Sequence, residues 1–252
     1  MTFNLGKIAA TLLVAATLVL PASAQTASAQ TAAPTAASGQ AQDFSQAERL
    51  LLMTPQFKGI KPPLKLGYRY RLTGTLKDET AFEDRVTVSL TALAQGRCCK
   101  ASGEFLSGPR RLGLPEVEQA EGNPVTLFFL ERDIREMNRR TKGSASYFRK
   151  RLRMALYESA TVSDIEVQYR GKTVAGRQIV IRPYADDPNK DRFSQLARKQ
   201  YVFVLSDAVP GTVVSIRSGV AGTDGGPNGG PTLLDEELLL DGAQPPAWPA
   251  PG

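Results

Sequence analysis

The pattern that most constrains the fold is a period-two alternation of apolar and polar side chains. Residues 66–76 alternate leucine and tyrosine with arginine and threonine, and residues 86–91 repeat the pattern with valine and leucine. Such alternation predicts strands with one buried face, because successive side chains of a strand point to opposite sides of the sheet. The polar stretch 77–80 between them is short, so we expect two neighbouring antiparallel strands.

Other segments carry the same strand signals. Turn residues at 170–172 and at Pro210-Gly211 predict two hairpins, and a glycine-rich stretch at 219–231 predicts a loop before the last strand. The further strands are expected at 101–106, 165–169, 179–181, 201–205, 213–217 and 233–240. The inner face of the sheet is expected to carry Tyr68, Tyr70, Val86, Val88, Leu90, Tyr169, Ile179, Phe203 and Leu205.

Helices are predicted between the blocks of strands. Ser45 and Glu48 have the spacing of a capping box, so a short helix should begin there and end before Pro55. Helical periodicity marks two longer helices and a possible turn or two at 191–198. Their apolar stripes are Leu127, Leu130, Ile134 and Met137 in the first, and Phe148, Leu152, Ala155 and Leu156 in the second.

This order of elements predicts an α+β fold. Helices that come between blocks of strands, instead of alternating with each strand, are typical of an antiparallel sheet with helices on one face. We expect a single domain at 43–242 with about seven strands in a curved, half-barrel-like sheet. Such a sheet can enclose an apolar cavity under its helices.

The first 24 residues predict export. Lys7 precedes an apolar run at 8–20, and Ala22-Ser23-Ala24 has the small residues of a signal-peptide cleavage site. The run is shorter than the roughly 20 residues of a membrane span. We therefore expect a bacterial periplasmic or secreted protein with no transmembrane segment after cleavage.

Two segments outside the expected domain are predicted not to fold. Residues 25–42 contain only small and polar residues, so they cannot offset the entropy of ordering and predict a disordered linker. Residues 243–252 are rich in proline and predict an extended tail that contains Trp248, the only tryptophan.

Several classes of enzyme are excluded by what the sequence lacks. The chain has no histidine and only two cysteines, which are adjacent, so neither a histidine-activated nucleophile nor an ordinary zinc or copper site can be built. It has no phosphate-binding glycine loop and no dinucleotide fingerprint. We therefore expect a protein that is not an enzyme and has no cofactor.

Carboxylates are the remaining candidates for catalysis. They are Asp186, Asp187, Asp235, Glu236 and Glu237. A pair of carboxylates can act as acid and base on a glycoside. We favour the structural interpretation, in which the first two form a turn and the other three lie on an exposed strand face.

Positive charge is concentrated in the predicted pair of helices. Residues 131–153 contain nine basic and three acidic side chains, a net charge of +6, which equals the net charge of the whole chain. The residues expected to face an anionic partner are Arg132, Arg135, Arg139, Arg140, Arg149, Lys150 and Arg153. An anionic lipid, an envelope polymer or an acidic protein would fit such a patch, whereas an exported protein rarely meets nucleic acid. The alternative is an ordinary solvated helix face.

Cys98 and Cys99 leave three possibilities open. The chain contains no third cysteine with which either of them could pair. A vicinal disulfide, an intermolecular bridge and free thiols are all compatible with the sequence.

Together these features predict a periplasmic binding or carrier protein for a lipid-like or anionic envelope ligand. An adaptor that binds another envelope protein is the second hypothesis. A carboxylate-dependent hydrolase of envelope sugars is the third.

Overall fold

The computed structural model describes residues 43–77, 79–94, 98–113, 115–222 and 232–247. Within it, Gln42–Gly252 form one compact unit. The expected signal segment, the linker at 25–42 and Trp248 lie outside the described residues.

The centre of the fold is one antiparallel sheet of eight strands. Its spatial order is β3-β2-β1-β8-β7-β6-β5-β4, so two meanders meet where β1 pairs with β8. The strands are β1 (Leu64–Thr73), β2 (Phe82–Thr91), β3 (Lys100–Phe105), β4 (Thr161–Tyr169), β5 (Lys172–Ile181), β6 (Gln200–Leu205), β7 (Val213–Val220) and β8 (Leu234–Leu240). The predicted α+β class and antiparallel sheet are confirmed, with eight strands where about seven were expected.

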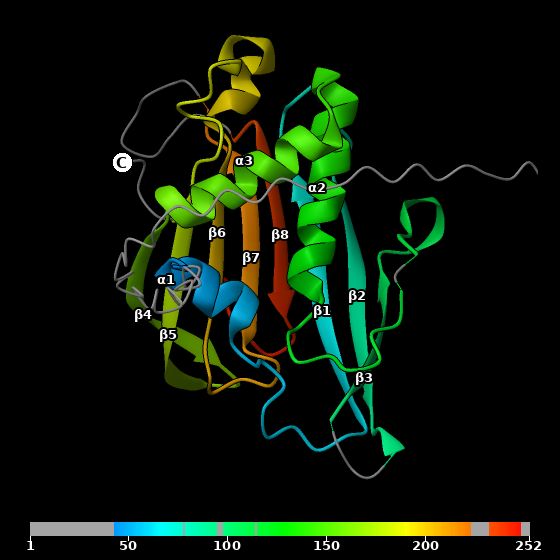
Figure 1. Ribbon diagram of the computed structural model, residues 1–252. Helices are drawn as coiled ribbons and strands as arrows, with labels where there is room; N and C mark the ends of the chain where they lie inside the picture. The colour runs from blue at the N-terminus through cyan, green and yellow to red at the C-terminus, as the bar shows by residue number, and fades with distance from the viewer. Residues whose placement is uncertain (1–42, 78, 95–97, 114, 223–231, 248–252) are drawn as a thin grey trace, which may run out of the picture. The chain divides into compact units, whose positions relative to one another are not determined.

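The helices lie on one side of this sheet (Figure 1). They are α1 (Gln46–Glu48) continued by the π-helical turn η1 (Arg49–Met53), then α2 (Val125–Thr141), α3 (Ala145–Glu158) and the 3-10 segment η4 (Lys190–Arg198), with a 3-10 turn η3 at Gly108–Arg110. In Figure 1, α2 lies along the strands near β1 and β8, while α3 crosses the sheet over β5 to β7.

The predicted capping box is present. The Glu48 N–H donates to Ser45 Oγ at 3.1 Å, and the Ser45 N–H donates to the Glu48 carboxylate at 3.0 Å. Ser45 Oγ also donates to the Leu156 carbonyl at 2.8 Å, which ties the start of α1 to α3. The short helix ends at Met53, before Pro55, as expected.

Large aromatic residues fill the space between the helices and the sheet. Tyr70 of the sheet packs on Phe105 of β3 and on Phe129 of α2, and Phe148 of α3 packs on Tyr184. All five side chains are fully buried. The interior under the helices is therefore a packed core, and the cavities described below lie at the surface.

One residue of the expected inner face lies on the other side. The register pairs Val162 with Ile179, so Ile179 faces the helices with Val162, while Tyr169, an odd number of positions away, faces the opposite side. There Tyr169 forms a bridge with Ala243, and the Gln244 N–H donates to the Gln168 carbonyl at 3.0 Å. The edge strand β4 thus contacts the segment that follows β8, and Tyr169 is partly buried and packs at the margin of the core.

The central strands are buried on both faces. Every residue of β6 and of β8 is buried. The expectation that Asp235, Glu236 and Glu237 lie on an exposed strand face is therefore wrong. Glu236 points toward the helices, while Asp235 and Glu237 lie on the opposite face, where Arg217 and Arg71 pair with them.

The predicted α2 stripe is wrong at one position. Leu130, Ile134 and Met137 are buried, as expected, but Leu127 is 58% exposed. The core positions of the first turn of α2 are taken by Val125 and Phe129 instead.

No helix in the described part of the chain is long and apolar enough to cross a membrane.

Candidate functional site: a groove between α2 and α3

An apolar groove lies at the surface between α2 and α3. Its volume is about 460 Å³, and η1 and the loop around Leu112 complete its walls. The apolar side chains along it are Leu52, Leu112, Pro115, Leu127, Phe128, Leu130, Ile134, Leu152 and Leu156. Its volume lies within the range of about 300–1,000 Å³ that is usual for small-molecule sites.

Helical spacing brings these side chains together. On α2, residues 127, 130, 131, 134 and 135 form one stripe, and on α3, residues 149, 152, 153 and 156 form another. The two stripes face each other because the helices are joined by a short connection, in which Lys142 has a left-handed conformation. Each stripe combines leucine or isoleucine with arginine.

Exposed apolar side chains gather beside the groove. Leu52 of η1 and Leu127 of α2 line it and are 46% and 58% exposed, and Met53 and Tyr157 are exposed nearby on η1 and α3. Among the described residues, the one other large apolar side chain with comparable exposure is Val117. A cluster of this kind is a usual mark of a binding surface, whereas single exposed apolar residues are ordinary.

Three arginines and one glutamate form the polar part of the groove. Arg149 makes a two-pronged contact with Glu131, from Nη2 to Oε1 at 2.7 Å and from Nε to Oε2 at 3.1 Å, and Arg135 Nε lies 3.6 Å from Glu131 Oε1. Arg153 has no ion-pair partner among the described residues. The groove therefore has an excess of positive charge, with one arginine free to meet an anionic group.

The predicted basic patch divides into three parts. Arg135, Arg149 and Arg153 line the groove, and Lys150 is exposed on the next face of α3. Arg139 and Arg140 lie at the end of α2 and pair with Glu136. Arg132 is largely buried, so it does not share a surface with the others.

Arg132 belongs to an ionic cluster inside the core. Its Nη1 donates to Glu236 Oε1 at 2.5 Å, and its guanidinium carbon lies 5.1 Å from the centre of the Tyr70 ring. The Tyr70 hydroxyl donates to the same glutamate oxygen. Burial raises the pKa of Glu236 and of Tyr70, in each case against the opposing effect of Arg132.

A second ion pair lies beside the first. Lys199, directly before β6, pairs with Asp133 of α2, and the Tyr201 hydroxyl donates to the other Asp133 oxygen at 2.5 Å. The Lys199 and Asp133 side chains are 1% and 0% exposed. Burial, reinforced by Asp133, raises the pKa of Tyr201. Two neighbouring α2 residues of opposite charge are thus each matched by the sheet, which fixes the position of α2 and hence of one groove wall.

The five candidate carboxylates do not converge on one site. Glu236 is in the ionic cluster, while Asp235 and Glu237 lie on the other face of the sheet. Asp187 is buried against the first half of α3, where it pairs with Arg151 at 2.8 Å and accepts a hydrogen bond from Tyr147 at 2.6 Å, and Asp186 is exposed next to it. Each of the four buried carboxylates is held by an arginine, an arrangement typical of structural ion pairs.

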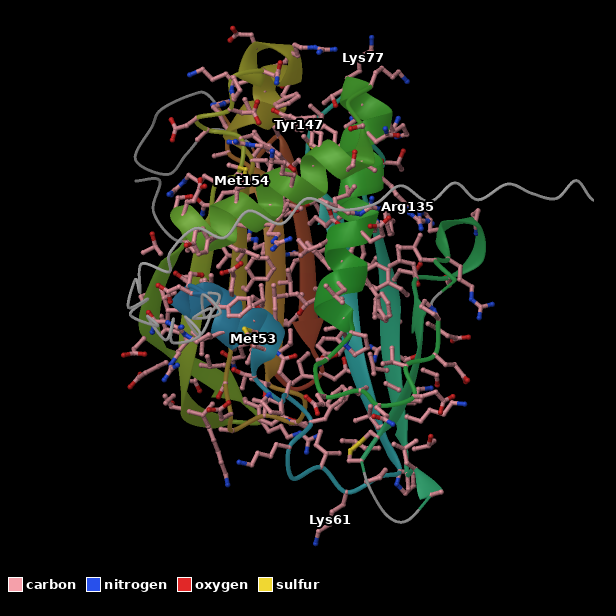
Figure 2. All side chains as sticks on the ribbon, in the orientation of Figure 1. Met53, Lys61, Lys77, Arg135, Tyr147 and Met154 are labelled. Atoms are coloured by element: carbon pink, nitrogen blue, oxygen red, sulfur yellow. A yellow bond between two sulfur atoms is a disulfide. The ribbon has the colours of Figure 1, made fainter. Side chains whose placement is uncertain are left out.

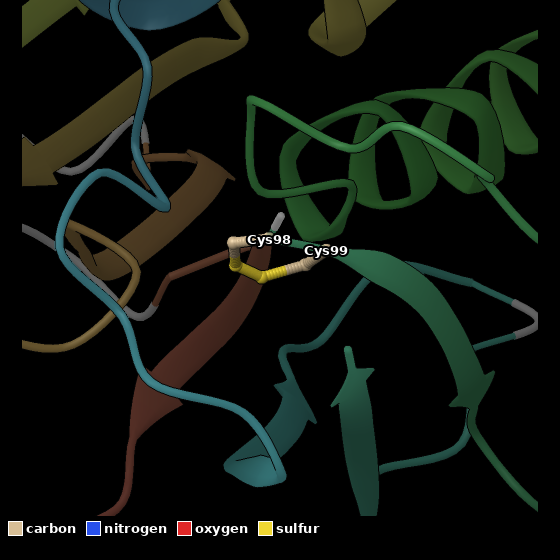
Figure 3. Close-up of a disulfide and its surroundings, with 2 residues drawn as sticks. All are labelled: Cys98 and Cys99. Atoms are coloured by element: carbon tan, nitrogen blue, oxygen red, sulfur yellow. A yellow bond between two sulfur atoms is a disulfide. The ribbon is translucent and has the colours of Figure 1, made fainter. Parts of the chain in front are cut away.

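Cys98 and Cys99 are joined by a disulfide just before β3 (Figure 3). Cys99 is fully buried and Cys98 is partly buried against the core. The Ala120 N–H donates to the Cys99 carbonyl at 2.9 Å, which attaches this turn to the segment before α2. Neither cysteine lines the groove.

Sequence reasoning missed the apolar half of this site. Leu127 was predicted as part of the buried stripe of a helix, Leu52 was not singled out, and Glu131 was counted only as a charge. The available signal was the α3 series Arg149, Leu152, Arg153 and Leu156, which alternates arginine with leucine along one stripe instead of separating them onto two faces. In the described part of the chain, no group of side chains is suited to hold a metal ion.

The sequence matches no protein-family model and no curated protein.

Proposed function

We propose that this protein is an exported, periplasmic binding or carrier protein for an anionic amphiphile, and that the groove between α2 and α3 is its binding site. The ligand has one apolar chain, which lies on the leucines of the groove, and an anionic group, which binds Arg153. The observation that carries the proposal is the combination of an exposed apolar groove with an arginine that has no ion-pair partner among the described residues.

The apolar part of the groove supplies the affinity. Leu127 and Leu52 remain about half exposed beside Ile134 and Leu152, so a bound chain would remove apolar surface from water on several sides. Each buried methylene contributes about 0.8 kcal/mol. A chain of several methylenes therefore offsets the entropy lost on binding.

The charged part supplies selectivity. Arg149 and Arg135 share Glu131, whereas Arg153 is exposed, lines the groove and has no ion-pair partner among the described residues. A carboxylate or phosphate gains a charge-assisted hydrogen bond from a guanidinium, and a zwitterionic or uncharged head group gains less. An anionic amphiphile is therefore preferred over a neutral one of the same chain length.

The export half of the proposal rests on the amino-terminal pattern alone. The charged start, the short apolar run and the small residues at 22–24 support a signal peptide. Antibody detection of a tagged chain in periplasmic and cytoplasmic fractions tests it, and a product of full length in the cytoplasm would contradict it.

The binding half is tested by titration with a fatty acid below its micelle concentration, followed by calorimetry. The protein used is residues 25–252, which retains the compact unit that begins at Gln42. We expect saturable binding of a fatty acid and at least about tenfold weaker binding of the uncharged alcohol of equal length.

Two variants separate the two parts of the site. Leu127→Asn places a polar group on the groove wall and should weaken both ligands alike, whereas Arg153→Gln should weaken only the fatty acid. Arg198→Gln is the matched control, because Arg198 is exposed on η4 and does not line the groove. Equal affinity for acid and alcohol, or binding unaffected by both groove variants, would contradict the proposal.

A further inference from the structure

A second hollow lies on the other side of α3. Its volume is about 540 Å³, and it lies between the beginning of α1 and the outer face of α3. Phe44, Met154 and Tyr157 give it an apolar lining, and Lys150 and Arg153 give it positive charge. Arg153 lines both this hollow and the groove, so the two features form one continuous surface.

The exposed face of α3 carries both basic and apolar side chains. Lys150, Arg153 and Tyr157 have the spacing of one helical stripe, and all three are exposed. Tyr157 is 53% exposed, and Met53 of the neighbouring turn η1 is 49% exposed. Figure 2 shows Met53 and Met154 on the side of the sheet that the helices cover. Apolar and basic side chains therefore share one face of the molecule.

The acidic side chains of this surface are already engaged. Glu48 is buried and bonded to the Ser45 N–H, and Asp43 lies 3.9 Å from Arg49. Glu131 is shared by the groove arginines. Lys150 and Arg153 have no ion-pair partner within the described ranges, so the net charge that the surface presents is positive.

We infer that this face, made of Met53, Lys150, Arg153 and Tyr157, docks on the surface of an anionic lipid bilayer. Peripheral membrane binding combines apolar side chains that enter the interface with cations that meet anionic head groups, and this face has both. Tyrosine is suited to the interface because its ring is apolar and its hydroxyl stays hydrated. A bilayer, unlike a single amphiphile, is contacted by side chains outside the groove.

Docking goes beyond ligand binding and is separable from it. Met53, Lys150 and Tyr157 do not line the groove, and the groove walls at Ile134 and Leu130 are too buried to reach a flat surface. Docking at this face would bring the groove opening next to the lipid, since Arg153 belongs to both.

The test is sedimentation with vesicles, using residues 25–252 so that the apolar amino-terminal run does not contribute. Vesicles of phosphatidylcholine alone are compared with vesicles that also contain phosphatidylglycerol. We expect binding to the anionic vesicles that weakens as salt is added, and little binding to the neutral ones.

Variants on the face provide the decisive comparison. Met53→Gln combined with Tyr157→Gln should weaken vesicle binding at least about tenfold, and Lys150→Gln should weaken it about fivefold. The matched control is Val117→Gln, which changes an exposed apolar residue outside the face and should leave binding unchanged.

The outcomes of the docking test and of the groove test are independent. The Met53 and Tyr157 double variant should keep its affinity for a water-dispersed fatty acid, whereas Leu127→Asn should lose it. No binding to anionic vesicles, or equal loss with Val117→Gln, would overturn the docking proposal and leave the groove proposal standing. A wild type that binds anionic vesicles but binds no fatty acid would overturn the groove proposal and leave the docking proposal standing.

Discussion

Lys199, which directly precedes β6, and Asp133 of α2 form an ion pair whose two side chains are 1% and 0% exposed. It lies beside the pair of Arg132 with Glu236 of β8, and Tyr201 of β6 also donates to Asp133, so adjacent residues of α2 are held from two different strands. This arrangement sets the position of α2, and α2 carries one wall of the groove. The stability of the core and the shape of the proposed site are therefore linked.

Removing one member of the buried pair should be costly. Lys199→Met leaves Asp133 as an uncompensated buried charge, and we expect a loss of about 3–5 kcal/mol in the free energy of unfolding. Urea denaturation measures it. Lys199→Met combined with Asp133→Leu should cost less than the single change because no charge remains unpaired, and Arg198→Gln should cost little. A double variant less stable than the single one would contradict this explanation.

Glu136 should make stability dependent on pH in the acidic range. Burial opposes ionisation, but hydrogen bonds and charge from Arg139 and Arg140 hold the pKa of Glu136 below its ordinary value of 4.5. A lowered pKa means that the unfolded chain takes up the proton first as pH falls. The stabilisation is therefore complete above pH 4.5 and is lost as pH falls through the lowered value.

The corresponding measurement compares unfolding of the wild type and Glu136→Gln from neutral to acidic pH. We expect a difference of about 1 kcal/mol near neutral pH, which shrinks below pH 4.5. Glu166→Gln, at an exposed position of β4 without an ion-pair partner in the described chain, is the control. A difference that persists unchanged in acid would show that the ion pairs are not its cause.

Gly211 should not tolerate a side chain. Its φ is +74°, and a Cβ atom would lie 2.7 Å from Leu66 Cδ1 and 2.9 Å from Asn123 Nδ2. The Asn123 amide cannot move freely, because it donates to the Tyr68 hydroxyl at 2.8 Å and to the Gly211 carbonyl at 3.0 Å. We expect Gly211→Ala to cost about 2–3 kcal/mol.

Gly59 separates the two causes of that loss. Its φ is +77°, but no atom lies within 4 Å of the position of an added Cβ. Gly59→Ala should therefore cost only the backbone strain, about 1 kcal/mol. Equal losses for the two alanine variants in urea denaturation would mean that the contact with Asn123 has no effect.

Removing the Ser45 side chain should lower both the stability of the protein and its affinity for a fatty acid. Ser45→Ala removes the cap of α1 and the tie to Leu156, and should cost about 1 kcal/mol. Because η1 follows α1 directly and carries Leu52, the same change should weaken fatty-acid binding. Ser144→Ala, which removes the cap of α3, should cost a similar amount without weakening the ligand. Identical effects of both variants on affinity would contradict the proposed role of η1.

Local patterns predicted the elements of the fold well. The capping box at Ser45, the alternation in β1 and β2, and the turn at Pro210-Gly211 each depend on residues close together in sequence. Their physical cause is local, so one sequence is enough to identify them. The α+β arrangement follows from the order of these elements.

Such local patterns do not predict contacts between residues that are far apart in sequence. The side of the sheet on which Tyr169 lies depends on the contact of β4 with Ala243, which is far away in sequence. The burial of Glu236 depends on Arg132, 104 residues earlier. Charge alone suggested that Glu236 is exposed, because a buried charge is rare unless a partner is known.

Of the candidate groove, only the arginine side chains were singled out from the sequence as binding residues. Arg135, Arg149 and Arg153 do lie together, but Arg132 is turned into the core by Glu236. Helical periodicity placed Leu127 on the buried stripe of its helix. It could not show that Val125 and Phe129 occupy the core positions there instead. The groove arises from packing between α2, α3 and η1, which no single helical pattern encodes.

Native mass spectrometry of the protein purified from a bacterial periplasm tests the central claim most directly. We expect the wild type to carry the added mass of an anionic amphiphile, Leu127→Asn to lose it, and Arg198→Gln to retain it. A bare wild type that also fails to bind added fatty acid would contradict the proposal that the groove holds an amphiphile, and would direct attention to a protein partner for this surface.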